Sequence, residues 1–283
     1  MKNLLKIVLS VIILAAVSNH CLAQSDSITP TSIHVSNITG IEYDRMSSAN
    51  NRRTSVTNSG IYMQQSGNDN DITINQVNTY QLIAGNGSQT APVQGNNNKI
   101  VINQGDVISK FGQSLVELSV YGDMNSVTAN QSTNINGNST GVDLGGHYQS
   151  VQISGSLNTV STSQIGQNNY AEVNITGNNN NQLLLQNGSG LQSFTSISGN
   201  NNILNTTQIG TGQHFLDVTL TGDSNSVTAT QSGSIKNSAT INLTNAGGPA
   251  SVNLIQTGGQ TYSVSQTCIT PSGCGTVVIR QGN

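Results

Sequence analysis

The sequence has little of what an ordinary globular enzyme contains. Only 7% of its 283 residues are charged, 4% are aromatic, four are Pro and none is Trp. Soluble domains have about 25% charged and about 45–50% apolar residues, whereas the apolar share here is 34%. We therefore do not expect one large aliphatic core. Charge-driven disorder and a basic nucleic-acid-binding face are not expected either, because the net charge is only -3.

The chain is instead rich in carboxamides and glycine, with 39 Asn, 24 Gln and 30 Gly. An amide that is buried without a hydrogen-bond partner costs about 1–3 kcal/mol. A chain of this composition therefore folds only if a repetitive arrangement provides partners for its amides.

The first 23 residues have the pattern of a secretory signal peptide. Lys2 and Lys6 precede an apolar run over residues 7–17, and Ala23 provides a small residue before a cleavage site at Gln24. The run is shorter than the roughly 20 residues that span a bilayer, so a retained membrane anchor is the less favoured alternative. The pattern predicts an exported protein whose mature chain begins at Gln24.

Two cysteines remain after this leader, Cys268 and Cys274, with five residues between them. In an exported protein, such a pair favours one disulfide that closes a small C-terminal loop. Two free thiols are the alternative. A zinc site is not favoured, because two cysteines alone cannot form one and no His lies nearby in the sequence.

A ten-residue unit that recurs seven times is the strongest signal in the sequence. Each copy begins with Gly, has Asn three positions later and ends with Gln nine positions later. An apolar residue follows the Asn by two positions in every copy except one, where Gln182 stands instead. The last four closing glutamines are 22, 22 and 23 residues apart, and the phase continues at Gln256 and Gln281. The units contain Gly67, Gly95, Gly122, Gly155, Gly177, Gly199 and Gly222; Asn70, Asn98, Asn125, Asn158, Asn180, Asn202 and Asn225; and Gln76, Gln104, Gln131, Gln164, Gln186, Gln208 and Gln231.

Segments of alternating polarity precede several of these units. Val151 and Ile153 precede Gly155, and Val173 and Ile175 precede the next unit, with polar residues between them. Such alternation predicts β-strands. The glycines between the segments predict tight turns, because Gly takes positive φ freely. Each repeat is expected to be strand, turn, strand, turn, and no segment after residue 23 has helical periodicity.

Residues two apart in a strand share a face, so the Asn and Gln of each unit are expected beside its aliphatic residues on the inner face. Their burial is tolerable if coils stack about 4.8 Å apart, so that each amide bonds its equivalents above and below. The sequence therefore predicts an all-β fold, a β-solenoid with two short strands per coil, forming a rod on the order of 35 Å long. The strand edges at the ends of such a rod are templates for another copy unless they are capped.

These residues resemble the curlin repeat of bacterial curli fimbriae. That repeat runs Ser, five residues, Gln, one residue, Gly, two residues, Asn, five residues, Gln. Ser59, Gln65, Gly67, Asn70 and Gln76 match it at every named position.

Other copies match the curlin repeat in part. Gln164, Gly166 and Asn169 match its middle, but Ile175 replaces the last Gln. The core of Gln, one residue, Gly also recurs at 186–188, 208–210, 231–233 and 256–258, so the resemblance covers roughly residues 59–281.

The resemblance implies a secreted functional-amyloid subunit. Its expected partners are further copies of itself, other curlin-type subunits, and an outer-membrane export pore with accessory factors. It implies cross-β fibres on the bacterial surface that serve adhesion and biofilm matrix. It also implies that residues 24–58 are an irregular, secretion-targeting segment before the repeats of residues 59–283. The chain departs from the family in its length, its variable coils and its Cys pair, so a main subunit, a nucleator and an associated surface protein all stay open.

No enzymatic activity, cofactor or metal site is expected. The three histidines after the leader, His34, His147 and His214, accompany no nucleophile and base pattern, and His147 is expected to have a loop role in a Gly-rich insertion. The carboxylates are scattered, so a paired acid and base of the glycosidase type has no support.

The remaining charged residues have structural interpretations. Turn stabilisation is favoured over calcium binding for the aspartates that lie beside Asn, which are Asp69, Asp71, Asp123 and Asp223. Arg45, Arg52 and Arg53 could meet an export partner or an acidic surface, although a solvated segment is the simpler interpretation.

Two other functions stay open. One is a monomeric β-solenoid adhesin or anchor with capped ends. The other is a ligand-binding solenoid, for ice or for glycans, that uses its outward Thr rows; the irregular mixture of outward Ser, Thr and Asn disfavours it.

Overall fold

The computed structural model describes residues 24–26, 59–77, 81–85, 90–105, 111–132 and 144–282. The expected signal peptide lies outside these residues, as does the segment 27–58 with its three arginines. Residues 24–26, at the start of the segment expected to be irregular, form a short strand. The part of the chain that the structure describes contains no helix long and apolar enough to cross a membrane.

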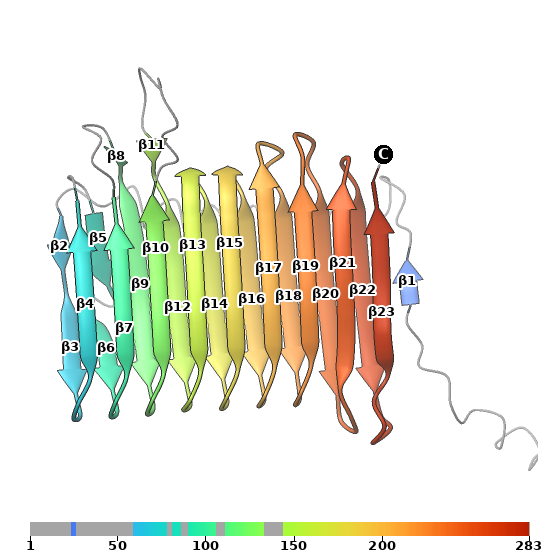
Figure 1. The fold of residues 1–283 in the computed structure, drawn as a ribbon, viewed down its shortest axis with the longest axis horizontal. Helices are drawn as coiled ribbons and strands as arrows, with labels where there is room; N and C mark the ends of the chain where they lie inside the picture. The colour runs from blue at the N-terminus through green and yellow to red at the C-terminus, as the bar shows by residue number, and fades with distance from the viewer. Residues whose placement is uncertain are drawn as a thin grey trace, which may run out of the picture.

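The described residues form two long sheets that lie face to face as the two layers of a rod (Figure 1). The strands of sheet A, in spatial order, are β1 (Gln24–Asp26), β22 (Thr261–Cys268), β20 (Ser238–Asn245), β18 (Phe215–Thr221), β16 (Gln192–Ser198), β14 (Tyr170–Thr176), β12 (Tyr148–Ser154), β9 (Ser114–Tyr121), β5 (Gln81–Ala84) and β2 (Gly60–Ile61), with β3 (Met63–Ser66) and β6 (Ala91–Gln94) off this path.

The strands of sheet B follow one another along the rod in the same direction as those of sheet A. Its strands are β23 (Gly275–Gln281), β21 (Ala250–Thr257), β19 (Ser226–Ser232), β17 (Ile203–Gly210), β15 (Asn181–Ser189), β13 (Thr159–Gln167), β10 (Ser126–Ser132), β7 (Lys99–Gln104) and β4 (Asp71–Gln76), with β8 (Phe111–Gly112) and β11 (Leu144–Gly145) off this path.

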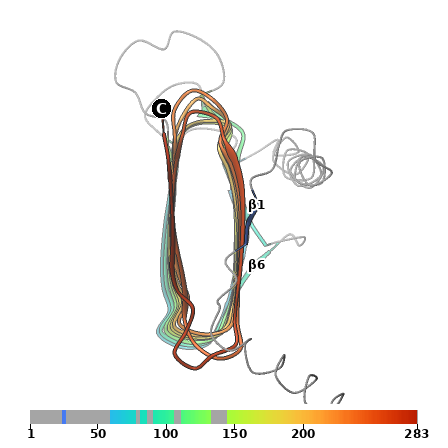
Figure 2. The ribbon, with the colours of Figure 1, turned by 90° about the vertical axis from the view of Figure 1, so that its right-hand side faces the viewer.

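The chain alternates between the sheets, and each strand lies parallel to the strand one coil later. Equivalent residues stack without a shift: Val127 pairs with Val160, and Gln131 with Gln164. Seen along the rod, the coils superpose as one narrow, flattened loop (Figure 2). The result is a β-solenoid of about eight turns, which confirms the predicted fold. The exception to the parallel arrangement is β1, which pairs antiparallel with β22.

The core lies between the sheets and follows the predicted alternation. In β10, Val127, Ala129 and Gln131 point inward and are buried, whereas Thr128 and Asn130 point outward and are half-buried. The aliphatic residues of successive coils form one continuous cluster along the rod. Each coil therefore buries its apolar side chains mainly against its own opposite strand and the adjacent coils, as expected for a solenoid.

The turn from sheet A to sheet B explains the repeated Gly. Gly177 has a φ of 124°, and Asn179, two positions later, lies in the left-handed region with a φ of 56°. A Cβ on Gly177 would also overlap the backbone carbonyl of Gly199 in the next coil. The Gly is thus required twice, by its own backbone conformation and by the close approach of the neighbouring coil. The same clash with the next coil would occur at Gly67, Gly95, Gly122, Gly155 and Gly199.

The opposite turn, from sheet B to sheet A, varies in length. Between β14 and β19, two residues connect β15 to β16, and four connect β17 to β18. The turn from sheet A to sheet B keeps four residues at 155–158, 177–180, 199–202 and 222–225. Differences in coil length in this part of the rod are therefore confined to one long side.

Candidate self-assembly site: the amide ladders

A column of eight glutamines runs through the interior of the rod; we call it the Gln ladder. In every step, Nε2 of one Gln donates a hydrogen bond of 2.8–3.0 Å to Oε1 of the Gln one coil closer to the C-terminus. The sequence placed Gln256 in this phase only by its spacing, and it is a full member. The members are Gln76, Gln104, Gln131, Gln164, Gln186, Gln208, Gln231 and Gln256.

The second amide hydrogen of each ladder glutamine is also used. Nε2 of Gln164 donates to the carbonyl of Tyr148 at 2.9 Å, and Nε2 of Gln186 donates to the carbonyl of Tyr170 at 2.9 Å. A Gln inside the ladder therefore has both donor hydrogens and its acceptor oxygen satisfied. This removes the penalty for an unpaired buried amide and explains how a column of carboxamides that is buried from Gln104 to Gln256 is tolerated.

A second column, the Asn ladder, lies at the opposite end of the sheet B strands and runs in the other direction. Nδ2 of Asn158 donates to Oδ1 of Asn125 at 3.1 Å, and the backbone N–H of Asn158 donates to the same oxygen at 3.0 Å. The other Nδ2 hydrogen bonds the carbonyl of Gly177 in the next coil at 2.8 Å. Asparagines therefore donate toward the N-terminal end, whereas glutamines donate toward the C-terminal end. The members are Asn70, Asn98, Asn125, Asn158, Asn180, Asn202 and Asn225.

The sequence did not predict a third column, formed by the residue after each turn glycine. Its side-chain oxygen accepts the backbone N–H of the equivalent residue one coil earlier. Asp123 accepts from Asn96 at 2.7 Å, and Asp223 accepts from Asn200 at 2.6 Å. These two aspartates accept hydrogen bonds within turns, whereas Asp71 is not in a turn as predicted but begins strand β4. In the described ranges, no group of three or more His, Cys, Asp or Glu side chains could hold a metal ion.

Gln182, the exception at the apolar position of the repeat, is buried in the core. Its Nε2 donates to the hydroxyl of Thr195 on the opposite strand of the same coil. Gln149 makes the equivalent bond to Thr162 with the sheets exchanged. A long Gln facing a short Thr preserves the width of the core, although the Oε1 atoms of both glutamines have no partner.

His147 lies in the connection between β11 and β12, in agreement with the loop position that the sequence predicted. It directly precedes β12, and its side chain is fully buried. Its Nε2 lies 3.0 Å from the carbonyl oxygen of Ser132, to which it donates, so Nδ1 is left to accept the backbone N–H of Asn169 at 3.4 Å. The ring therefore connects the ends of successive coils.

His214 occupies the same column three coils later. Its Nε2 lies 3.1 Å from the carbonyl of Ile209, and its Nδ1 accepts the backbone N–H of Asn237 at 3.1 Å. Burial lowers the pKa of His214 below its usual 6.5, against the smaller raising effect of backbone hydrogen bonds. The neutral ring is the form that suits this site, because only a neutral Nδ1 can accept.

The two ends of the rod differ. At the N-terminal end, β4 is the last strand of sheet B, and among the described residues none donates to Oε1 of Gln76. At the C-terminal end, Ala250 stands where the Asn ladder would continue, so that ladder stops at Asn225. Gln281 is in register with Gln256, but its Oε1 has no partner.

The C-terminal end also carries two additions that the other coils lack. A disulfide joins Cys268, at the end of β22, to Cys274, just before β23, with the two Cα atoms 5.5 Å apart. Strand β1 covers three residues of the outer edge of β22, from Ser263 to Ser265. The last turn is thus closed covalently, while β23 stays the outermost strand of sheet B.

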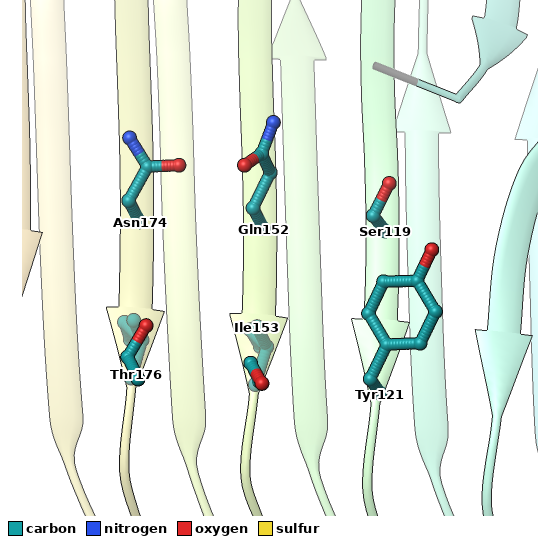
Figure 3. Close-up of a pocket in the computed structure, with 8 residues that line it drawn as sticks. Ser119, Tyr121, Gln152, Ile153, Asn174 and Thr176 are labelled. Carbon is teal, nitrogen blue, oxygen red and sulfur yellow. The ribbon is translucent and has the colours of Figure 1, made fainter. Parts of the chain in front are cut away.

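A shallow hollow of about 550 Å³ lies on the outer face of sheet A. Ser119, Gln152 and Asn174 form one row across β9, β12 and β14, and Tyr121 and Thr176 stand nearer the strand ends (Figure 3). The lining offers hydroxyls, amides and one ring, and no carboxylate, imidazole or cysteine. The hydroxyls and amides of this surface can donate and accept hydrogen bonds.

Comparison of the chain with known protein families, with curated proteins and with solved structures finds no match. The geometry of the ladders and of the two ends therefore carries the functional argument.

Proposed function

We propose that this chain is an exported structural subunit that stacks on further copies of itself to form curli-like amyloid fibres on the bacterial surface, where the fibres serve adhesion and biofilm matrix. The observation that carries this proposal is the pair of directional amide ladders inside the rod. A ladder is lengthened by one more coil without any new type of contact, and a parallel coil ends in an edge of unpaired backbone groups.

The described ends fit a head-to-tail junction. If β23 of one copy stacks on β4 of another in the register of the other coils, Gln281 of the first meets Gln76 of the second. Nε2 of Gln281 then donates to Oε1 of Gln76, in the same direction as all the other steps of the Gln ladder. The half-buried Ile72 and Ile74 of β4 would be covered by the second copy, which adds apolar burial to the hydrogen bonds.

The experiment dilutes the purified chain from denaturant and follows amyloid-dye binding, seeding and fibre diffraction. We expect seeded fibre growth and a meridional spacing of about 4.8 Å. Gln208→Ala should slow growth strongly, because it breaks the ladder. The matched control is Thr207→Ala on the same strand, whose side chain points outward and is half-buried. Equal growth rates for the two variants, or wild-type solutions that stay monomeric, would contradict the proposal.

The C-terminal end supports a second candidate, a monomeric surface adhesin or anchor. The disulfide turn, the stop of the Asn ladder at Asn225 and the pairing of β1 with β22 all make this end unlike the coils behind it. This candidate predicts a stable monomer at every concentration, without dye binding. Analytical ultracentrifugation over a range of concentrations separates the two.

A further inference from the structure

The outer face of sheet B presents large apolar side chains to solvent in the middle of a polar surface. Leu183 on β15 is 48% exposed, and Ile203 on β17 is 45% exposed. Ile209, Ile255 and Val278 are exposed on the same face, on β17, β21 and β23. Exposed aliphatic side chains that gather on one face of a protein mark an interaction surface.

This face is also without charge over most of its length. On the six strands of sheet B from β10 to β21, no described residue is Asp, Glu, Lys or Arg. The charges of the face lie near its ends, at Asp71, Lys99 and Arg280. A neutral face does not attract an anionic membrane, which is recognised through Lys and Arg. It suits a partner surface that is neutral as well, because the centres of protein interfaces are depleted in charged residues.

The apolar side chains of this face stand between smaller polar ones. Leu183 lies between Ser161 and Asn205 in the row that crosses the strands. Ile203 has Ser226 beside it on the next strand. Large side chains therefore project from the face, with space around them above their shorter neighbours. Two copies of such a surface can interdigitate, as the paired sheets of a steric zipper do.

The face is flat and large enough for a stable contact. The coils superpose when the rod is viewed along its axis, so the sheet has little twist (Figure 2). Flat sheets of many strands are typically stabilised by stacking on another sheet. Nine strands that lie about 4.8 Å apart and are about 23 Å long cover about 1,000 Å². A stable interface buries about 800 Å² on each partner.

We propose that the outer face of sheet B docks on the same face of a second copy of this chain, so that two rods lie side by side with Leu183 and Ile203 in the contact. A second copy has the same strand spacing, the same lack of charge and the same mixture of large and small side chains, so the contact continues from one coil to the next. The outer face of sheet A is less suited to such pairing, because Glu117 and Asp217 lie in one of its outward rows. The pairing is lateral, and it does not depend on head-to-tail stacking.

Sedimentation of the freshly refolded mature chain over a range of concentrations measures this pairing before fibres grow. We expect an equilibrium between monomer and dimer. The variant L183K/I203K should raise the dissociation constant at least about tenfold, because like charges that face each other across an interface repel. The control variant N174K/T221K adds the same charge at exposed positions on the outer face of sheet A, and it should pair as the wild type does. Equal dissociation constants for the two variants, or a wild type that is monomeric at every concentration, would overturn the proposal.

Hydroxyl-radical footprinting of the wild type locates the contact without any substitution. Leu183 and Ile203 should be oxidised at least about threefold more slowly in the dimer than in the monomer. Ile235 and Met124 are exposed outside the strands and should keep their rates. A dimer in which Leu183 and Ile203 are not protected would overturn the proposal. So would equal protection in the monomer, because another part of the same chain would then be the cover.

The mass per length of the fibres separates this pairing from the head-to-tail stacking proposed above. Paired rods should give twice the mass per length of fibres grown from L183K/I203K. Wild-type fibres with the mass per length of a single row of rods would overturn the lateral pairing and leave the stacking intact. Dimers that form without any fibres would support the pairing and contradict only the stacking.

Discussion

A double-mutant cycle in the Gln ladder is the most direct test of how the rod is held together. Gln186→Ala removes the 2.8 Å bond to Gln208 and the 2.9 Å bond from Gln164. It leaves one donor hydrogen of Gln164 and the Oε1 of Gln208 buried without partners. At about 1–3 kcal/mol for each orphaned group, plus the loss of the buried side chain, we expect the variant to lose about 4 kcal/mol of unfolding free energy.

The second mutation decides whether the bond itself is responsible. Gln208→Ala alone orphans a hydrogen of Gln186 and the Oε1 of Gln231. In the double variant Gln186→Ala/Gln208→Ala, the two groups that faced each other are both absent. The double variant should therefore lose about 2 kcal/mol less than the sum of the single losses. Gln131→Ala combined with Gln208→Ala, three coils apart, should be additive.

Urea unfolding measures these differences, with the m-value checked in every variant because repeat arrays can unfold in parts. Amide hydrogen exchange in β15 and β17 shows which strands lose protection when the stability falls. Thr228→Ala, an outward and exposed position on β19, should stay within about 0.5 kcal/mol of wild type. Additive losses for the adjacent pair would refute the view that each Gln is stabilised mainly by its neighbours in the ladder.

Two further predictions concern a turn and a ring. Gly177→Ala should lower the unfolding free energy by at least about 2 kcal/mol, because its Cβ would overlap the carbonyl of Gly199 and its φ is 124°. Ser224→Gly, at a φ of 61°, should be neutral or slightly stabilising. Thermal melts of the two variants check this contrast. Because burial lowers the pKa of His214, the folded chain binds fewer protons at this residue than the unfolded chain does. The contribution of His214 to stability is therefore complete above pH 6.5 and is lost as the pH falls through the lowered pKa. His214→Asn, which places at this position the residue found one coil later at Asn237, should flatten the stability profile between about pH 7 and pH 5; an unchanged slope in urea titrations would show that another group titrates.

The alternation of the strands and the fixed phase of the repeat were sufficient to predict the solenoid. Parity alone assigned Val127 and Gln131 to the inner face, and the spacing alone aligned Gln164 with Gln186. Both inferences work because, in a parallel stack without a shift, residues one repeat apart in the sequence lie next to each other in space. The direction of donation in each ladder was not predictable, because it depends on which carbonyl lies nearest to each amide.

Other columns were missed because their members differ chemically. The residue after the turn glycine is Asn96, Asp123 or Ser156 in different coils, and these share only an oxygen acceptor. A search for identical residues does not find such a column. The burial of His147 was missed for another reason: a long connection precedes this residue, so its phase in the repeat could not be counted.

The burial of Tyr148 on the outer face of sheet A had no local signal in the sequence. Tyr148 and Gln149 are consecutive, and both are buried. Alternation reports only the face that packs against the opposite sheet. The alternation of a strand contains no information about which side chains of its outer face are buried.

The contrast between the two long sides of the rod has a practical consequence. Neighbouring coils approach through their backbones on both sides, because a Cβ would overlap the carbonyl of the next coil at Gly177 and also at Gly188 and Gly210. Between β12 and β19, however, the turns from sheet A to sheet B all have the same length of four residues. The turns from sheet B to sheet A differ in length, from two residues between β15 and β16 to four between β17 and β18. Foreign peptides or small binding modules grafted at residues 211–213 would be carried on that side alone. If such subunits stacked end to end, the grafted peptides or modules would lie in a single line along one side of the filament.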